Sequence, residues 1–403
     1  MALRKPPRPT TRQCSEAIAS AMPNWTTSPL VATVLPPGEG FGPGRTGAIG
    51  HLVRRLTMVS PSLVIGGPQA GPIFDNVLFR PAKPSPWRLG NVNQRYTASV
   101  ARILGETRPE IVEVWNRPEI ALALMDRFPR LPVMLFLQND PQSMRGARTP
   151  AQRHLLLDRL ARVVTASAFL SRRMIEGVPS PARSPFVIPN WLDLAALPPE
   201  GPRENLILFT GRVVPEKGTD SFVAACAAAL PRLPGWRAEI IGADRFRSDA
   251  PDTGFVRSVR TAAKAAGVAM LGYRDHPEVL ASLARSAIAA VPSRWDEPFG
   301  LAALEAKACG AALLCSRRGG LPEVTADAAV FIDPDDPAGF ADTIVSLAQD
   351  ANRLAALAQA GRARARRFGV EAAALQLAVL RREILPAGGS PPPPHLYSAE
   401  QRR

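Results

Sequence analysis

Short apolar runs alternate with helical stretches along most of this 403-residue chain. The runs have the length of strands and are apolar throughout, as in strands that are buried on both faces of a sheet. Strands that alternate with helices form parallel sheets with helices on both sides. In the first half we expect strands at 30–35, 63–65, 111–115, 133–137, 163–166 and 186–188, with helices at 48–57, 119–128 and 149–162 among them. The pattern predicts a doubly wound α/β protein.

A second series begins at residue 206, after a stretch rich in Pro and Gly. Its first run, 206–210, leads into a loop that carries Arg212 and Lys217. Open α/β sheets bind ligands at the carboxyl ends of their strands, and two cations at such a place can neutralise a diphosphate. The alternative is a basic surface turn without a ligand.

Two carboxylates, Glu297 and Glu305, flank the expected start of a helix at Pro298. The backbone N–H groups of Phe299, Gly300 and Leu301 would be unpaired there, and a helix N-terminus favours anions. Glu305 would lie about two turns further along, roughly 12 Å from the start. One elongated, hydroxyl-rich, phosphorylated ligand, such as a nucleotide-sugar, could touch all three places. The alternative is a solvated helix with two surface carboxylates.

These segments resemble, in sequence order, the retaining glycosyltransferases of family 4, which have the GT-B fold. The resemblance rests on motifs at 209–212, 215–218, 238–242, 271–273, 291–295, 297–305, 319–323 and 331–334. It implies two Rossmann-like domains that face each other across a cleft. It also implies a nucleoside-diphosphate-sugar as co-substrate, UDP- or GDP-linked, with no other cofactor. The acceptor could be a glycan, a lipid-linked molecule or a small molecule.

The resemblance also assigns roles on the donor side. It implies that Glu297 acts on the transferred sugar as the catalytic residue, that Glu305 accepts hydrogen bonds from the ribose, and that backbone atoms of 272–276 meet the base. The cations and the helix start would stabilise the leaving diphosphate, so no metal ion is needed. The acidic turn at 333–336 is interpreted as a helix cap and not as a metal site.

On the acceptor side, a Gly-rich loop at 36–47 follows the first strand. In the resembling family this loop faces the cleft, which makes the candidates Gly42, Gly44, Thr46 and Gly47. Two further strand ends add Asn116, Gln138 and Asp140. Relatives often carry a titratable His where this chain has Gln138, and an amide hydrogen-bonds but cannot titrate. For Asp140 the alternative role is a turn.

The resemblance and the composition together give a domain layout. We expect a flexible arm at 1–28, an acceptor-side domain at 29–197, a linker at 198–204, a donor-binding domain at 205–370, a helix crossing back to the first domain at 371–386 and a disordered tail at 387–403. The stretch from 337 to 385 reads as one long helical region. His51 and His154 are interpreted as structural, and His276 as a neighbour of the base.

The net charge of +14 raises the question of an anionic partner. Nucleic acid is not expected, because the basic residues are spread along the chain without interleaved aromatics. An anionic membrane surface is the more plausible partner, through Arg54–Arg55, Arg172–Arg173 or the arginines at 362–367. With no apolar signal-like core and four scattered Cys, we expect a cytoplasmic protein, either free or peripheral on the inner face of a membrane.

Three other functions remain open on the same scaffold. The first is a catalytically weak protein that binds nucleotide-sugars or assists assembly, and Gln138 favours it. A GT-B epimerase and a phosphorylase are the other two. Release of nucleoside diphosphate that depends on an added acceptor distinguishes a transferase from a binding protein and from an epimerase.

Overall fold

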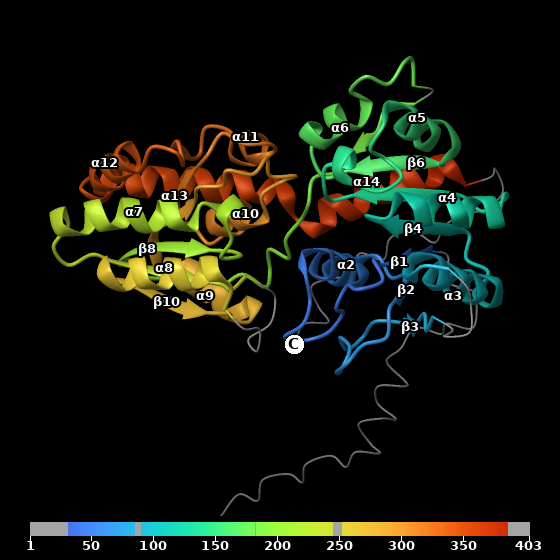
Figure 1. Ribbon diagram of the computed structural model, residues 1–403, viewed down its shortest axis with the longest axis horizontal. Coiled ribbons are helices and arrows are strands. Elements are labelled where there is room, and N and C mark those ends of the chain that lie inside the picture. The colour runs from blue at the N-terminus through green and yellow to red at the C-terminus, as the bar shows by residue number, and fades with distance from the viewer. Residues whose placement is uncertain (1–30, 85–89, 182, 245–251, 386–403) are drawn as a thin grey trace, which may run out of the picture.

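The structure, a computed structural model, describes residues 31–84, 90–181, 183–244 and 252–385 (Figure 1). The expected arm at 1–28 and tail at 387–403 lie outside these ranges. The described chain forms two lobes, each built around one parallel sheet with helices on both faces. The expected class, α/β with two doubly wound sheets, is therefore confirmed.

The first sheet has seven parallel strands in the order β3-β2-β1-β4-β5-β6-β7. Its strands are β1 Val31–Val34, β2 Leu63–Gly66, β3 Phe79–Pro81, β4 Ile111–Trp115, β5 Val133–Leu137, β6 Arg162–Thr165 and β7 Phe186–Val187. Its helices are α2 Ala48–Val59, α3 Val92–Thr107, α4 Pro118–Arg127, α5 Pro150–Arg159 and α6 Ala168–Ile175. The central strands are buried at every position, which explains why they read as continuous apolar runs.

The second sheet has six parallel strands in the order β10-β9-β8-β11-β12-β13. Its strands are β8 Glu204–Thr210, β9 Arg237–Ile241, β10 Val268–Gly272, β11 Ser286–Val291, β12 Ala312–Cys315 and β13 Val330–Phe331. Its helices are α7 Thr219–Ala229, α8 Gly254–Ala265, α9 His276–Arg285, α10 Leu301–Ala308, α11 Leu321–Thr325, α12 Pro337–Ala348 and α13 Ala351–Ala365. Short 3-10 turns η1 (Pro141–Ser143), η2 (Pro215–Lys217), η3 (Leu230–Arg232) and η4 (Arg366–Phe368) complete the connections.

The strand order reverses once in each sheet, between β1 and β4 and between β8 and β11. Such a switch point leaves a crevice at the carboxyl ends of the two strands, where the following loops diverge. In the second sheet these loops are 211–218 and 292–300, which hold Arg212, Lys217 and Glu297. Topology therefore brings together side chains that lie about 80 residues apart in the sequence.

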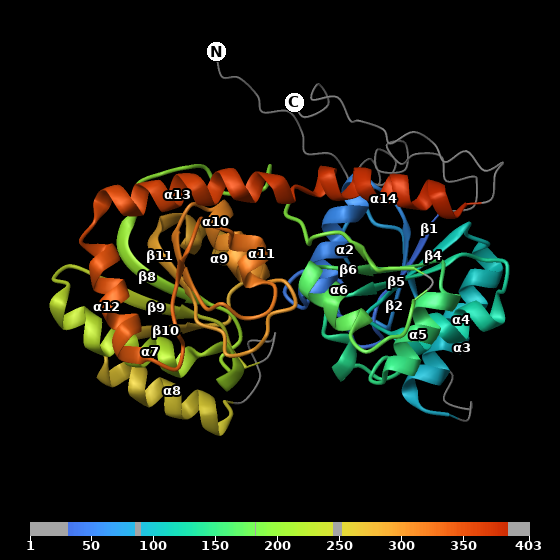
Figure 2. The same cartoon turned by 90° about the horizontal axis from the view of Figure 1, so that it is seen from above.

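The chain crosses between the lobes twice, and the two crossings are hydrogen-bonded to each other. Leu192 N–H donates to Phe368 O at 2.8 Å, and Val370 N–H donates to Leu192 O at 2.9 Å. Helix α14 (Val370–Ile384) then continues over the first lobe, roughly in line with α13 over the second (Figure 2). On the first lobe Arg381 reaches the fully buried Glu113 of β4 at 2.7 Å. The last helix is thus an integral part of the first lobe's core.

The region 337–385 is helical, as expected, and it consists of three helices. Asp350 caps α13 by accepting from Arg353 N–H, and Gly369 takes an extended backbone before α14, the expected crossing helix. One expectation about a helix start was wrong. Helix α10 begins at Leu301 and not at Pro298, since Gly300 has a left-handed φ of 105° that interrupts the helix. Glu297 consequently lies in a loop and not in the first helical turn.

Lys307 of α10 is completely buried, and burial lowers its pKa to about 8. Its Nζ donates to Thr325 O at 2.7 Å, at the end of α11. The unfolded side chain titrates near pH 10.4, so between about pH 8 and 10 the unfolded state holds the extra proton and the folded state gains stability. We expect the stability of wild type relative to Lys307→Met to rise by about 2 kcal/mol across this window.

Chemical denaturation of both proteins at pH 7.5 and pH 9.5 measures this difference. The comparison cancels the buried Cys and Tyr groups, which both proteins share. If the difference in unfolding free energy between the two proteins were the same at both pH values, Lys307 would not titrate in this range.

Candidate active site

An ion pair joins the two loops at the switch point of the second sheet. Lys217 Nζ lies 2.5 Å from Glu297 Oε1, and the side chain of Glu297 is only 8% exposed. The loops are fixed to each other because the backbone N–H groups of Arg294 and Trp295 donate to Glu216 O. At Gly218, which has a positive φ, a Cβ atom would lie 2.0 Å from Pro292 O. Only glycine allows this close approach, which sets Lys217 beside Glu297.

Two further glycines, Gly319 and Gly320, contact the backbone of Glu297. Gly320 N–H donates to Glu297 O at 2.6 Å. A Cβ atom on Gly319, which has a φ of +58°, would lie 2.3 Å from the same oxygen. The backbone of Glu297 is therefore held between the 319–320 turn and the loop of Lys217, and its carboxylate has little freedom to move.

The start of α10 next to this pair has no side-chain cap. Gly300 is the N-cap residue, and its φ of 105° turns the chain into the helix at Leu301. Phe299 does not face a ligand: it is 3% exposed and packs edge-on against Phe368, with ring centroids 5.8 Å apart. The backbone of 299–301, more than the side chains, is thus what an anion could meet.

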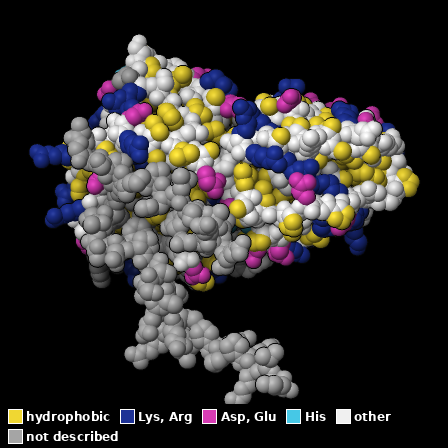
Figure 3. All heavy atoms as spheres, turned by 180° about the vertical axis from the view of Figure 1, so that it is seen from behind, with side chains coloured by type: hydrophobic (Ala, Val, Ile, Leu, Met, Phe, Trp, Pro, Cys, Tyr) yellow, Lys and Arg dark blue, Asp and Glu magenta, His cyan; other side chains and the backbone are white. Residues whose placement is uncertain are grey.

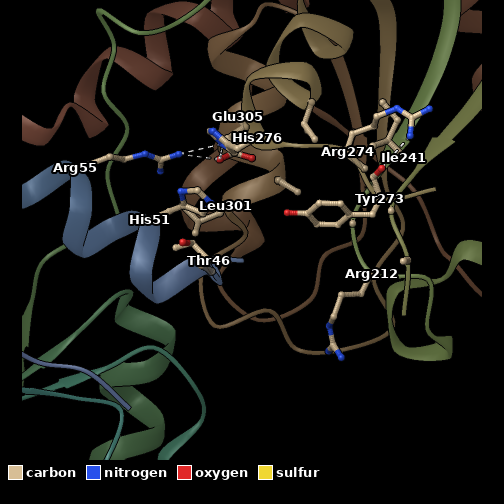
Figure 4. Close-up of a pocket in the computed structure, with 17 residues that line it drawn as sticks. Thr46, His51, Arg55, Arg212, Ile241, Tyr273, Arg274, His276, Leu301 and Glu305 are labelled. Atoms are coloured by element: carbon tan, nitrogen blue, oxygen red, sulfur yellow. Dashed lines mark hydrogen bonds and ion pairs between the residues drawn. The ribbon is translucent and has the colours of Figure 1, made fainter. Parts of the chain in front are cut away.

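A cavity of about 190 Å³ opens beside this loop, between the two lobes (Figure 4). From the first lobe α2 and its leading loop contribute Thr46, Ala48, His51 and Arg55; from the second lobe Arg212, Tyr273, Arg274, His276, Leu301 and Glu305 are among the lining residues. The side chain of Arg212 is exposed, and among the described residues it has no ion-pair partner. It remains available to an anionic ligand.

Glu305 is the most tightly held carboxylate of the cavity. Its Oε1 lies 2.8 Å from His276 Nε2 and 3.3 Å from Arg55 Nη2. Burial alone would raise the pKa of Glu305, but the hydrogen bond from His276 and the charge of Arg55 outweigh burial and lower it. Glu305 is therefore ionised at neutral pH. Arg55 was not expected here, because its contact with Glu305 exists only once the lobes meet.

His51 also faces the cavity, although its helical position indicated a structural role. Its ring lies 5.0 Å from that of His276, centroid to centroid. Burial, together with the neighbouring His276 and Arg55, lowers the pKa of His51 to about 4. His51 is thus neutral at physiological pH. His276 lines the same cavity, and its role as a neighbour of the base stays a prediction.

The Gly-rich loop 36–47 is folded on itself and contacts the second lobe. Thr46 Oγ1 donates to Gly42 O at 2.5 Å and accepts from Gly42 N–H. Gly44, with a φ of 71°, accepts a hydrogen bond of 3.4 Å from Tyr273 OH across the cleft. Gly47 is the N-cap residue of α2 and has no side chain with which to cap it. The Glu39 carboxylate takes over this role by accepting from Gly50 N–H in the first turn of α2. Burial raises the pKa of Glu39.

Asn116 and Gln138 lie side by side, directly after the neighbouring strands β4 and β5. Asn116 has a left-handed backbone, and its Oδ1 accepts from Gln138 N–H at 3.0 Å. Asp140 is engaged elsewhere, because its carboxylate caps η1 through Gln142 N–H and pairs with Arg173 at 2.9 Å. The turn role of Asp140 is confirmed, and its role toward an acceptor stays a prediction, as do those of Asn116 and Gln138.

The acidic turn at 333–336 is a turn and helix cap, as expected. Asp333 accepts from Asp335 N–H, and Asp336 accepts from Gly339 N–H at the start of α12. Across the described ranges, no three His, Cys, Asp or Glu side chains gather as a metal site requires. None of the helices in these ranges is long and apolar enough to cross a membrane.

Several arginines predicted to face a membrane are occupied within the protein. Arg55 is buried in the cleft, so the prediction of a surface-facing pair at 54–55 is wrong for it. Arg172 pairs with Glu323 and Arg173 with Asp140. Arg364 donates to Glu323 O. On the face shown in Figure 3, Lys and Arg side chains form separate groups among acidic and neutral ones. Nothing there indicates a single basic surface.

A family model matches the part of the chain that carries this site. Residues 198–364 match the family model "Glycosyl transferases group 1". A D-inositol 3-phosphate glycosyltransferase of Segniliparus rotundus is 36% identical over 194 residues, which cover 47% of this chain and 42% of that protein. A glycogen synthase of Mycobacterium tuberculosis is 36% identical over 180 residues, 43% of this chain and 41% of that protein. The matches thus span less than half the length of these relatives.

Solved structures match nearly the whole chain. Sucrose-phosphate synthase from Thermosynechococcus elongatus has a TM-score of 0.71 at 19% identity, covering 88% of this chain and 98% of that one. HepE from Anabaena, solved with UDP and glucose, has a TM-score of 0.69 at 17% identity, covering 87% and 98%. The protein has a GT-B fold: two Rossmann-like domains face each other across a cleft, and a C-terminal helix returns to the first.

Proposed function

We propose that the protein is a retaining glycosyltransferase that moves a sugar from a nucleoside-diphosphate-sugar to an acceptor. The observation that carries the proposal is the Lys217–Glu297 pair at the switch point, beside an exposed Arg212 and an uncapped helix start. Arg212 and Lys217 on one loop, and the uncapped backbone at 299–301 after the other, would suit a leaving diphosphate. A carboxylate at the same place suits a sugar that develops positive charge.

Within this proposal each donor group has its own protein partner. Arg212, Lys217 and the backbone at 299–301 hold the diphosphate. Glu297 faces the sugar and is the catalytic residue. Glu305, which is ionised and lines the cavity, accepts from the ribose hydroxyls. Protein cations and dipoles stabilise the leaving group, so we propose that turnover needs no metal ion.

The comparisons support the donor side of this proposal. The segment that matches the family model, residues 198–364, falls on the second domain, which carries Arg212, Lys217, Glu297 and Glu305. The HepE structure contains UDP and glucose, which agrees with a UDP-linked donor, while a GDP-linked donor remains the alternative. The acceptor is proposed only by class: a glycan, a lipid-linked molecule or a small molecule such as a sugar or a phosphorylated polyol. An association with anionic membranes stays a prediction.

The test of this function is release of nucleoside diphosphate. A thermal-shift screen of nucleotide-sugars first identifies the donor, since a ligand at 100-fold its Kd stabilises by about 2.7 kcal/mol. With that donor, we expect nucleoside-diphosphate release that depends on an added acceptor and persists in excess chelator. Release that needs Mg²⁺ or Mn²⁺ would refute metal independence. Tight donor binding without acceptor-dependent release across a broad acceptor panel would favour the binding-protein alternative.

Lys217→Ala tests the diphosphate site separately from turnover. Removing a charged hydrogen-bond partner should weaken nucleoside-diphosphate binding by about 1.5–3 kcal/mol, or roughly 10- to 100-fold in Kd. Calorimetry with UDP and GDP measures this change. Lys264→Ala, at an exposed position in the last turn of α8, is the matched control and should bind like wild type. An unchanged Kd for a folded Lys217→Ala protein would exclude Lys217 from the site.

A further inference from the structure

One arginine of the first domain occupies the carboxylate that the proposed function assigns to the donor ribose. Arg55 extends from α2 into the cleft, where its Nη2 lies 3.3 Å from Glu305 Oε1 (Figure 4). Its Nη1 donates to Trp191 O at 3.2 Å, which fixes the other end of the guanidinium. The side chains of Arg55 and Glu305 are only 11% and 13% exposed. The contact is therefore largely removed from solvent.

The same carboxylate oxygen also meets a histidine of the second domain. His276 Nε2 is 2.8 Å from Glu305 Oε1 and 3.1 Å from Arg55 Nη2. The shorter separation assigns the Nε2 proton to Glu305, so the approach of Arg55 to His276 brings two donors together. Two donors from opposite sides of the cleft thus share one acceptor oxygen. Neither nitrogen accepts a hydrogen bond from the other, so their close approach to each other is not stabilising.

We propose that Arg55 is a latch that holds the two domains together over an empty donor site, and that donor binding displaces it. The inference rests on the proposed function, in which Glu305 binds the ribose. A vicinal diol can donate its two O–H groups to the two oxygens of a carboxylate, and here Oε1 of Glu305 already accepts from two donors. The cavity, at about 190 Å³, is also smaller than the roughly 300–1,000 Å³ of typical ligand pockets.

Some other contacts between the domains use none of the donor residues. Ser167 Oγ donates to Pro298 O at 2.5 Å, and the Glu323 carboxylate accepts from the N–H groups of Ala168 and Phe169 at the start of α6. These contacts can persist while a donor is bound. The contact between Arg55 and Glu305 differs, because the donor ribose and the arginine compete for the same carboxylate. The apparent Kd of the donor then equals its intrinsic Kd divided by the fraction of molecules in the unlatched form.

The first experiment measures the latch without any ligand. Spin labels at Asp158→Cys and Lys264→Cys, both exposed and on different domains, report the interdomain distance; Cys14→Ser removes the cysteine outside the described residues. We expect Arg55→Met to lengthen or broaden the distance distribution, and Arg55→Lys to keep it near that of wild type. Arg54→Met, which changes the neighbouring arginine on the same helix, is the control and should have no effect. An unchanged distribution for a folded Arg55→Met protein would overturn the latch.

A double variant checks that Arg55 acts through Glu305. If the two residues form one latch, Glu305→Gln should open the domains as Arg55→Met does, and the combination should open them no further. Additive opening would mean that Arg55 acts through Trp191 O or another group, which would overturn the proposed pairing.

The second experiment measures donor binding with UDP-glucose and GDP-glucose as probes. Because competition is removed while His276 still pairs with Glu305, we expect Arg55→Met to bind the donor about 3- to 10-fold more tightly than wild type. Weaker binding would make Arg55 a donor ligand, and unchanged binding would make the contact incidental; both outcomes overturn displacement. If wild type binds neither probe in this assay or in the wider screen, the proposed function fails, and the distance measurements alone decide the latch.

Discussion

Glu297→Gln is expected to lower kcat by about 10²-fold or more while the KM for the donor changes little. The substitution keeps the shape of the side chain but removes the negative charge that lies 2.5 Å from Lys217. If Glu297 stabilises positive charge on the sugar, its contribution is made mainly in the transition state, and such a loss appears in kcat.

Glu305→Gln provides the contrast within the same experiment. The ribose changes little during sugar transfer, so losing its partner weakens the ground state and the transition state equally, which raises KM and spares kcat. The variant also releases Arg55, but without a full carboxylate the donor gains no benefit from the release. Steady-state kinetics of both variants with the identified donor decide the assignment. A near-wild-type kcat for Glu297→Gln would place this carboxylate away from the reacting centre.

The meeting of Lys217 and Glu297 was predictable because it follows from local patterns and from topology. Each lies in a loop after an apolar strand, and the strand order places both loops at one switch point. The ion pair itself was not predictable, because its geometry depends on Gly218 approaching Pro292 O. The sequence shows that a glycine is present but not which backbone it approaches.

The part of the site that joins the domains could not be predicted from local sequence. Arg55 and His51 lie on a helix with an ordinary amphipathic pattern, and their partners Glu305 and His276 are more than 200 residues away. Only the docking of the two domains creates these contacts. The interpretation of 54–55 as a surface pair failed for that reason, since a local arginine pair carries no information about a second domain.

The crossing helix was expected from residue 371, but the break between α12 and α13 was not predicted, for a different physical reason. The Ala-rich sequence on both sides keeps helical propensity, so no strong breaker marks position 349. The interruption depends on Asp350, which caps α13, and on the crossing at Gly369, which pairs with Leu192 of the other crossing. Capping by one aspartate is a weak sequence signal, and a contact between two interdomain crossings is not a local one.

Gly319→Ala should displace the backbone of Glu297. Of the substitutions proposed here, it should lower the free energy of unfolding the most. The new Cβ would lie 2.3 Å from Glu297 O and 2.5 Å from Glu297 N, and both are backbone atoms that cannot rotate away. The residue also has a φ of +58°, which favours glycine. Overpacking together with a left-handed alanine should cost about 2–4 kcal/mol of unfolding free energy.

The same clash should shift Glu297 relative to Lys217 and lower kcat by about 10-fold or more, since misplacing a catalytic group by 1 Å can cost 10²-fold. Thermal unfolding gives the stability change, and kinetics at a temperature well below the variant's Tm give the activity of the folded fraction. Gly201→Ala is the matched control, because a Cβ there meets nothing within 4 Å and its φ is ordinary. It should leave both Tm and kcat near wild type. If Gly319→Ala were as stable and as active as Gly201→Ala, the 319–320 turn would not be what holds Glu297 in place, and the carboxylate would have to owe its position to Lys217 alone.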